Sequence, residues 1–421
     1  MEYNKVVKRD HLLNQLIDGR HNNLIKIVTG IRRSGKTFLL FNLFSKYLHD
    51  EGIDDNHIIK IALDDRKNVK LCNPDSILEY FDSKFIDDKM YYVLIDEIQM
   101  LDDFVGVLNS LLHRHNVDTY VTGSNSKFLS KDVATEFRGR GDEIHIYPLS
   151  FAEYFNAVGG DMYECWSEYC TYGGLPQLLI LKGDKKKEEF LLGIQKTVYL
   201  KDLVERCIIK NQDEFQELLN VIASCIGSPC NPNKLANTFK SVKNITIDSK
   251  TISKYLSYME DAFLIEKSMR YDIKGKKYIG TLSKYYFQDI GLRNAATGFR
   301  QIEESHIMEN IIYNELRSRG FRVDVGLVEA WQQDNDKRQR RQLEVDFVAE
   351  QGSLRYYIQS VLMMPDNEKK EQEIASLKKI NDAFKRIIIV KSNMKPYYDD
   401  NGFLIMGLFE FLLKPEIMDN L

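Results

Sequence analysis

The feature that most constrains the fold is the glycine-rich stretch from Gly30 to Thr37 (GIRRSGKT). It follows a short β-rich run, residues 24–29, and precedes residues 36–48, whose apolar positions recur at helical spacing. Strand, glycine-rich turn and helix in that order is the setting in which G-x-x-x-x-G-K-[ST] binds phosphate. The glycines let the backbone N–H groups curl around a phosphate, and the helix adds the positive end of its dipole. The sequence therefore predicts a nucleotide site in a parallel sheet flanked by helices.

Each side chain of this predicted site has its own task. We expect Lys36 to reach the β- and γ-phosphates and the Thr37 hydroxyl to bind Mg²⁺. The predicted cofactors are therefore ATP and Mg²⁺. The residues expected to surround the nucleotide are Gly30, Ile31, Arg32, Arg33, Ser34, Gly35, Lys36, Thr37 and Phe38.

A second signal is an apolar strand that ends in two carboxylates. Residues 91–95 (YYVLI) are followed directly by Asp96 and Glu97. We expect Asp96 to hold the Mg²⁺ shell and Glu97 to orient or polarise the attacking water. A strand capped by an acidic turn is common by itself. Paired with the glycine-rich loop on the same predicted sheet, it favours nucleotide binding.

Two further groups are candidates for contact with a γ-phosphate. Ser124 and Asn125 follow a strand that ends at Thr122, where a polar sensing side chain is expected; an ordinary Gly-Ser-Asn turn is the alternative. Arg138 and Arg140 present guanidinium groups that could stabilise transition-state charge, in this chain or in a neighbouring subunit of an oligomer. The alternative is that both arginines belong to a solvated loop.

The rest of the chain suggests two more regions. Alternating strand-like and helix-like segments fill residues 1–158, and the pattern of residues 159–298 is mainly helical. Within that middle region, two helices (233–239 and 251–263) are followed by two β-like runs around residues 274–277, which is the layout of a winged helix. Residues 299–421 form a small α/β pattern. Its expected helices and strands are 307–319, 321–325, 344–349, 356–361, 367–381 and 386–390.

The middle region is locally basic. The stretch 234–284 holds 11 Lys and Arg residues against 5 Asp and Glu residues, whereas the whole chain has 58 against 62 and a net charge of −4. Such charge favours salt-sensitive contact with a double-stranded DNA backbone, and packing against a protein partner is the alternative. The candidate DNA contacts are Lys250, Lys254, Lys274, Lys276 and Lys277. The run Lys337 to Arg341 could also meet phosphate or form a solvated hairpin tip.

Composition narrows the classes of protein. Hydrophobic residues at 43% and charged residues at 29% are ordinary for globular domains, so a disordered chain is not expected. The first residues lack an apolar signal core, and the longest apolar stretch, 403–413, is too short to span a bilayer. Six scattered cysteines without C-x-x-C spacing read as reduced thiols. We therefore expect a cytoplasmic protein with no membrane partner.

Taken together, these motifs resemble a known group, the prokaryotic AAA-type P-loop ATPases whose phosphate loop reads G-x-R-R-x-G-K-[ST]. The resemblance covers nearly the whole chain. It implies an ATPase core, a winged-helix segment and a C-terminal domain similar to restriction endonucleases. Besides residues 30–37, the similar motifs are Val121 to Ser124, Arg138 to Arg140, Tyr147 to Phe151, Tyr172 to Pro176 and Tyr286 to Leu292.

The endonuclease-like resemblance implies a second metal site. That fold places a carboxylate on a helix, an Asp at a strand end and [EQ]-x-K on the next strand. Glu309, Asp346 and Gln359 can take the metal-side positions, but the lysine position holds Val361. An inherited scaffold without activity therefore competes with an active nuclease.

Three functional hypotheses remain open. The first is a Mg²⁺-dependent ATPase whose nucleotide state repositions the winged-helix and nuclease-like half, with DNA as a partner. The second is a nucleotide-gated switch that binds ATP and ADP and acts through a protein partner. The third is an ATP-dependent nuclease.

Overall fold

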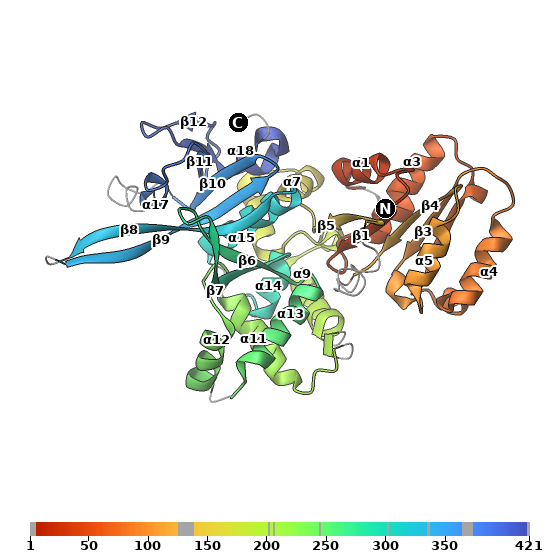
Figure 1. The fold of residues 1–421 in the computed structure, drawn as a ribbon, viewed down its shortest axis with the longest axis horizontal. Coiled ribbons are helices and arrows are strands. Elements are labelled where there is room, and N and C mark those ends of the chain that lie inside the picture. The colour runs from red at the N-terminus through yellow and green to blue at the C-terminus, as the bar shows by residue number, and fades with distance from the viewer. Residues whose placement is uncertain are drawn as a thin grey trace. The chain divides into compact units, whose positions relative to one another are not determined.

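The computed structural model describes residues 6–418 except 125–138, 201–202, 205–206, 244–245, 301–302, 335–336 and 364–373. The chain forms two compact units (Figure 1). The first comprises residues 1–148 with 261–263, and the second comprises 149–260 and 264–421. The second unit thus contains both the helical middle region and the C-terminal α/β region, and the division into three domains stays a prediction.

The first unit is built on a five-stranded sheet in the order β2-β3-β4-β1-β5. Every neighbouring pair is parallel, so the carboxyl ends of the strands share one edge. All six residues of β1 and of β3 are buried, as expected for central strands of a covered parallel sheet. This sheet confirms the parallel α/β fold predicted from the sequence. The strands are β1 (Ile25–Gly30), β2 (Ile58–Ala62), β3 (Tyr91–Asp96), β4 (Val117–Thr122) and β5 (Gly141–Ile146).

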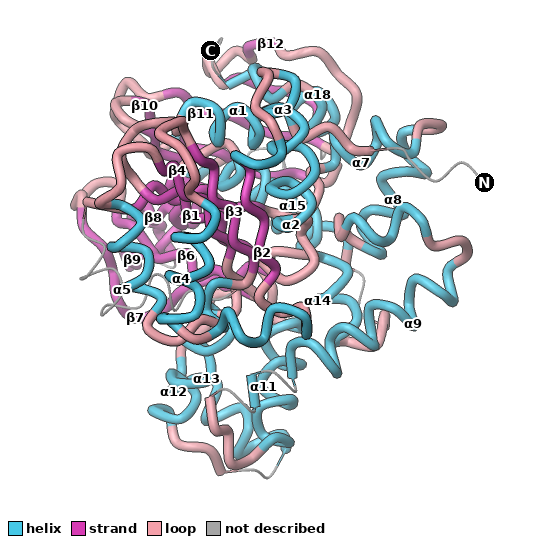
Figure 2. Tube along the Cα trace, turned by 90° about the vertical axis from the view of Figure 1, so that its right-hand side faces the viewer, coloured by secondary structure: helices cyan, strands magenta, loops and turns pink. Residues whose placement is uncertain are grey.

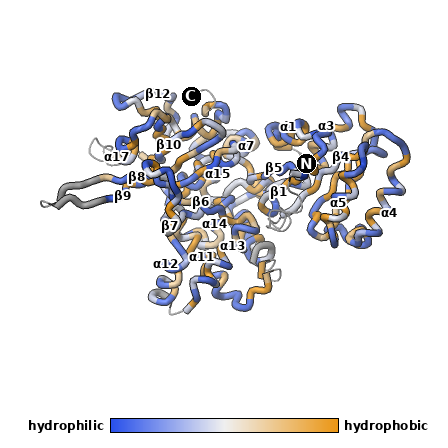
Figure 3. Tube along the Cα trace, in the orientation of Figure 1, coloured by the Kyte–Doolittle hydropathy of each residue, from blue (hydrophilic) through white to orange (hydrophobic). Residues whose placement is uncertain are grey.

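Helices cover both faces of this sheet, and their courses can be followed in Figure 2. On one face, leucines of α1 (Asp10–Asp18) pack with the apolar side of the helical stretch that begins at the glycine-rich loop. That stretch runs through α2 (Lys36–Phe38), the π-helical turn Leu39–Phe44 and α3 (Ser45–Asp50). On the other face, α4 (Pro74–Lys84) and α5 (Phe104–Leu112) cover a second apolar cluster. The alternation of apolar and polar positions along these segments is visible in Figure 3.

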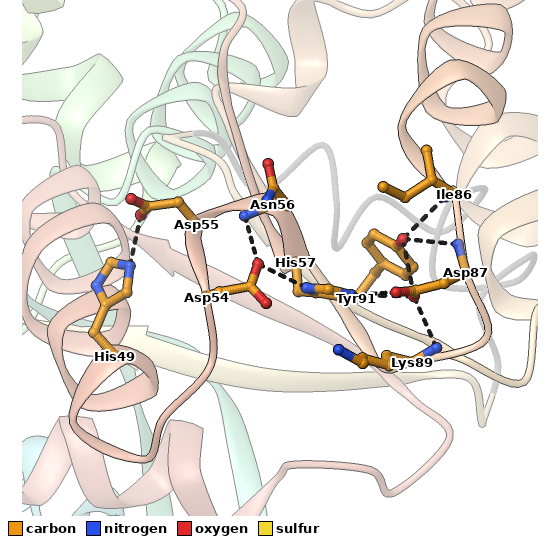
Figure 4. A network of polar contacts seen from close by, with 9 residues as sticks. All are labelled: His49, Asp54, Asp55, Asn56, His57, Ile86, Asp87, Lys89 and Tyr91. Carbon is orange, nitrogen blue, oxygen red and sulfur yellow. Dashed lines mark hydrogen bonds and ion pairs between the residues drawn. The ribbon is translucent and has the colours of Figure 1, made fainter.

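A polar network around His57 ties the connection before β2 to the segment before β3 (Figure 4). The ring bonds Oδ1 of Asp54 at 2.8 Å through Nδ1 and Oδ1 of Asp87 at 3.1 Å through Nε2. The hydroxyl of Tyr91 bonds Oδ1 of Asp87 at 3.2 Å. The hydrogen bond that Asp54 accepts from the His57 ring, more than any other contact, raises the pKa of His57, although burial opposes it.

The second unit begins with helices that the sequence pattern predicted in outline. Ser150 and Glu153 form a capping box at the first of them. The helices are α7 (Phe151–Val158), α8 (Met162–Tyr172), α9 (Asp184–Ile194), α11 (Gln212–Ser224), α12 (Pro232–Thr238), α13 (Ser249–Asp261) and α14 (Ile290–Ala296).

Two of the later sequence motifs meet at the buried carboxylate of Asp289. Its Oδ2 accepts the N–H of Gly174 at 2.8 Å, and its Oδ1 accepts the N–H of Leu292 at 2.9 Å. Burial raises the pKa of Asp289 to about 6, although these N–H bonds oppose the shift. The Tyr172 to Pro176 motif and the Tyr286 to Leu292 motif are therefore held together by hydrogen bonds to one buried carboxylate.

The second unit also holds an eight-stranded mixed sheet in the order β12-β13-β11-β10-β9-β8-β6-β7. Strands β6 and β7 are the antiparallel hairpin expected after α13. Strand β6 also pairs in parallel with β8, so the hairpin and the C-terminal strands share one sheet. The strands are β6 (Ile265–Asp272), β7 (Lys277–Phe287), β8 (Arg322–Asp334), β9 (Lys337–Gln351), β10 (Leu354–Val361), β11 (Lys385–Val390), β12 (Tyr397–Tyr398) and β13 (Leu404–Gly407).

Three C-terminal helices accompany this sheet. They are α15 (Glu304–Ser318), α17 (Ala375–Lys378) and α18 (Leu408–Leu413). The helix predicted over 367–381 lies partly outside the described residues, and α17 is the part of it that the structure describes. Among the described residues, no helix combines the length and the apolar character needed to cross a membrane.

Candidate functional site

The backbone of the glycine-rich loop adopts conformations that its sequence makes possible. Gly30, Arg33 and Gly35 have φ angles of 140°, 68° and 97°. A Cβ atom on Gly30 would lie 2.2 Å from the carbonyl oxygen of Ile146 on β5. Position 30 must therefore be glycine for reasons of both backbone angle and space.

Lys36 is buried at the start of α2, and its ammonium points back into the loop. Its Nζ donates to the carbonyl oxygens of Gly30 at 2.9 Å and Ile31 at 3.0 Å. Burial lowers the pKa of Lys36 to about 8, while the charges of Glu97 and Asp96 act in the opposite direction.

Asp96 ends β3 and is held by two threonine hydroxyls. Thr37 Oγ1 donates to Oδ2 of Asp96 at 2.8 Å, and the Thr122 hydroxyl donates to the other carboxylate oxygen. Burial raises the pKa of Asp96, and the two hydroxyls partly offset that shift. The structure therefore brings together the residues of the two predicted motifs, which lie on β3 and on the helix after β1.

Glu97 stands in a left-handed backbone conformation, with φ at 53°. Its N–H donates to Thr122 Oγ1 at 3.1 Å. Its Oε2 accepts a bond from the Ser124 hydroxyl at 2.9 Å and another from the Gln99 amide. Ser124 thus contacts the second carboxylate of the motif directly, whereas Asn125 lies outside the described residues.

The loop fits a phosphate-bearing nucleotide on its own geometry. The Ser34 hydroxyl is buried and has no hydrogen-bond partner among the described residues. The three residues with positive φ angles curve the loop around the Lys36 ammonium. In the described hydrogen bonds, this ammonium donates only to carbonyl oxygens of the loop. The Thr37 and Asp96 oxygens, 2.8 Å apart, are hard ligands of the kind that Mg²⁺ prefers. ATP and Mg²⁺ are therefore compatible with this site.

The two candidate arginines are not equivalent. Arg138 lies outside the described residues. Arg140 is exposed; its carbonyl accepts the N–H of Ile25, and its Nη1 donates to Asn109 Oδ1 at 3.0 Å. Ile25 starts β1, whereas the glycine-rich loop follows its end, so the length of a six-residue strand, about 16 Å, separates the Arg140 backbone from the loop. Within its own chain, Arg140 lies at the opposite edge of the sheet.

A second cluster of charged residues, centred on the buried Lys284, lies in the second unit. The Lys284 ammonium, on β7, lies 2.8 Å from Glu309 Oε1 on α15 and 2.7 Å from Glu344 Oε1 on β9. The Tyr286 hydroxyl also donates to Glu309 Oε1 at 2.6 Å. Burial alone would lower the pKa of Lys284, but Glu309, Asp346 and Glu344 outweigh it and raise that pKa.

Asp346 and Gln359 complete this cluster. Oδ2 of Asp346 accepts the N–H of Ser360 at 2.8 Å and its hydroxyl at 3.1 Å, while Gln359 Oε1 accepts the N–H of Asp346 at 3.4 Å. Burial and the charge of Glu309 raise the pKa of Asp346 to about 7. In the sequence, the lysine position of the endonuclease-like pattern is occupied by Val361, and Lys284 was not predicted to belong to this cluster. The one sequence signal for Lys284 was its position as a charged residue beside the apolar run at the end of β7.

The five lysines predicted to contact DNA all lie at exposed positions. Lys250 and Lys254 are on α13, and Lys274, Lys276 and Lys277 are at the turn between β6 and β7. Between α13 and the hairpin, a polar groove of about 660 Å³ is lined by several hydroxyl and lysine side chains. They include Ser249, Lys250, Ser253, Ser257, Lys267 and Ser283.

Comparison with known proteins gives matches over both units. Residues 22–155 match the model of a family described as an AAA domain, and residues 163–303 match that of a domain of unknown function. An uncharacterized protein of Haemophilus influenzae is 32% identical over an alignment of 419 residues that covers 97% of this chain and 99% of that protein. An uncharacterized protein of Methanocaldococcus jannaschii is 30% identical over 417 residues, covering 95% of this chain and 86% of that protein. A solved structure, a Walker-type ATPase of Pyrococcus abyssi, matches with a TM-score of 0.48 and 17% identity over 69% of this chain and 96% of that chain.

Proposed function

The chain belongs to a family of prokaryotic AAA-type P-loop ATPases, and from that premise we propose that it hydrolyses ATP to ADP and phosphate with Mg²⁺ as cofactor. The observation that carries this proposal is the meeting of Lys36, Thr37, Asp96 and Glu97 at one edge of the parallel sheet. Ligands of open α/β sheets bind at this carboxyl edge.

The geometry of each residue supports a proposed role. Lys36 would pair its ammonium with the β- and γ-phosphates, and the loop N–H groups would orient them. Thr37 and Asp96 would hold Mg²⁺, which would neutralise phosphate charge. Glu97 orients the attacking water and accepts its proton. Ser124 senses the γ-phosphate through its bond to Glu97.

Two variants separate nucleotide binding from hydrolysis. Lys36→Ala should lose ATP binding, measured by equilibrium titration with a fluorescent ATP analogue, because it removes the buried ammonium that would meet the phosphates. Glu97→Gln should keep binding and lose most of its phosphate release. Lys46→Ala is the matched control, since Lys46 is exposed on α3. Unchanged turnover in both site variants would exclude this assignment.

A second proposal concerns the partner of the second unit. The basic stretch 234–284, the exposed lysines of the β6–β7 turn and the polar groove beside α13 together favour contact with a DNA backbone. In this arrangement the nucleotide state of the first unit is coupled to a DNA-bound second unit. ATP turnover that rises with added double-stranded DNA at low salt, and loses that rise at high salt, supports DNA as the partner.

Two alternatives give different results in the same assays. A nucleotide-gated switch that acts through a protein partner would show no DNA binding even at low salt. An ATP-dependent nuclease would cleave DNA with Mg²⁺ or Mn²⁺ and lose cleavage in Asp346→Ala. The ion pairs of Lys284 with Glu309 and Glu344 favour a structural role for this cluster. Repeating the ATPase assay across protein concentration tests whether turnover depends on an oligomer, which an arginine acting from a neighbouring subunit would require.

A further inference from the structure

An arginine that directly precedes α1 donates a hydrogen bond to the backbone of the glycine-rich loop. Arg9 is 7% exposed, and its Nη1 donates to the carbonyl oxygen of Ser34 at 3.1 Å. Its Nη2 donates to the carbonyl oxygen of Tyr147 at 2.9 Å and of Pro148 at 3.3 Å. A single guanidinium therefore joins the loop to the segment that follows β5.

The two segments that Arg9 joins have different tasks. Ser34 directly precedes Gly35 and Lys36, so its peptide group belongs to the curve that would face the phosphates. Tyr147 and Pro148 are the last residues of the first unit before the chain continues into the second. The other end of the loop lies against the residue just before this segment, because Gly30 packs against the carbonyl of Ile146, the last residue of β5.

The chemistry of the contact makes these two segments move together. A guanidinium is planar and rigid, so its donors cannot follow two carbonyls that shift independently. A buried carbonyl without a donor is unfavourable, and α1 fixes the Arg9 backbone through bonds from Leu12 and Leu13 to its carbonyl. Moving the Ser34 peptide alone would break its bond to Arg9, so a displacement of this peptide favours a matching displacement of Tyr147 and Pro148.

We propose that Arg9 is a positioning residue that ties the conformation of the glycine-rich loop to the Tyr147–Pro148 segment, and so links nucleotide binding to the second unit. This inference rests on the proposed ATP binding at the loop. It assigns to Arg9 no contact with the nucleotide itself. Arg9 acts through the backbone of Ser34.

The test compares hydrogen exchange of peptides covering residues 141–158, with and without a non-hydrolysable ATP analogue, in the full chain. The wild-type protein should show slower exchange in this segment when the analogue is bound. Arg9→Met should lose most of that nucleotide-dependent difference and bind the analogue about tenfold more weakly. Arg20→Met is the matched control, because Arg20 bonds the hydroxyls of Tyr47 and Tyr92 and makes no described bond to the loop.

The outcomes separate this inference from the function on which it rests. Failure of the wild-type protein to bind the analogue overturns the proposed function. Binding without any nucleotide-dependent exchange difference at 141–158, or an Arg9→Met variant with the wild-type difference, overturns only the role of Arg9. If Arg9→Met does not fold, Arg9→Lys replaces it. Lysine keeps the charge but cannot bridge both segments with a rigid fork, so a full wild-type difference there also overturns the inference.

Discussion

The Ser124 hydroxyl lies 2.9 Å from Oε2 of Glu97 and donates a hydrogen bond to it. The two residues follow adjacent parallel strands, β4 and β3, so the bond crosses the carboxyl edge of the sheet. The same oxygen of Glu97 accepts a second bond from the Gln99 amide. The orientation of the carboxylate proposed to activate water is therefore set by its neighbours as well as by its own left-handed backbone.

Removing the Ser124 hydroxyl should impair hydrolysis more than nucleotide binding. A hydrogen bond to a charged group contributes about 1.5–3 kcal/mol, so Ser124→Ala should lower kcat by roughly 10- to 100-fold if that bond orients Glu97 during the reaction. The affinity for ATP should stay within about twofold, because none of the described hydrogen bonds joins Ser124 to Lys36 or Thr37. Steady-state phosphate release and analogue titration measure the two quantities. Ser110→Ala is the control, since the Ser110 hydroxyl donates to a carbonyl within α5.

Three lysines at the β6–β7 turn should set part of the salt dependence of DNA binding. Replacing Lys274, Lys276 and Lys277 by alanine removes up to three cations that would pair with DNA phosphates. The slope of log K against log salt should then become shallower by about 0.9 for each phosphate that is no longer neutralised. Fluorescence anisotropy with a labelled duplex at several salt concentrations measures the slope. Alanines at Lys182, Lys185 and Lys186, which are exposed in or near α9, should leave it unchanged.

How much of the fold and of the candidate site could be predicted from the sequence depends on how far apart in the chain the interacting residues lie. The glycine-rich loop and the strand that ends at Asp96 and Glu97 were predicted because strand, turn and helix are encoded by adjacent residues. The hairpin after α13 was predicted for the same reason. The position of Arg140 was not, because it depends on β5 joining the sheet beside β1. Sequence spacing alone gives no strand order.

Lys284 shows the same limit in the second unit. Its partners, Glu309 and Glu344, lie 25 and 60 residues further along the chain and on different elements. They meet because β6 pairs in parallel with β8, which joins the hairpin to the C-terminal sheet. A parallel pairing between strands so far apart leaves no local pattern in the sequence.

The His57 network should make the stability of the first unit depend on pH in a defined window. Folding raises the pKa of His57, so the protonated ring stabilises the folded state. This stabilisation is complete below the ordinary pKa of 6.5 and is lost as the pH rises through the folded-state pKa. The pKa values of Asp54 and Asp87 are lowered, so their contribution is present above 3.8 and is lost as the pH falls through their folded-state pKa values. The network therefore stabilises the fold most between about pH 4 and 6.5.

His57→Gln tests this window. Hydrogen exchange of amides in β2 and β3, followed by mass spectrometry, should be faster in the variant than in the wild-type protein near pH 6. The difference, corrected for intrinsic exchange rates, should shrink above pH 8. His49→Gln is the control, because His49 bonds only the exposed Asp55 among the described contacts. A constant difference across this pH range would show that the ring packs against Tyr91 without carrying the charge.

Replacing Lys284 should destabilise the second unit strongly. The side chain is 3% exposed and offsets the charges of Glu309 and Glu344, so Lys284→Met leaves the buried carboxylate of Glu309 and the partly exposed carboxylate of Glu344 without this cation. Breaking a buried pair in this way costs about 3–5 kcal/mol. Both tryptophans, Trp166 and Trp331, belong to the second unit, so denaturant unfolding followed by tryptophan fluorescence reports on that unit. Lys185→Met is the control: its side chain is 88% exposed, and its pair with Glu189 contributes little to stability.

Adding Glu309→Gln to Lys284→Met should recover part of the lost stability, because one uncompensated charge is removed. If the two substitutions instead lower the stability additively, Lys284 stabilises the fold through packing alone.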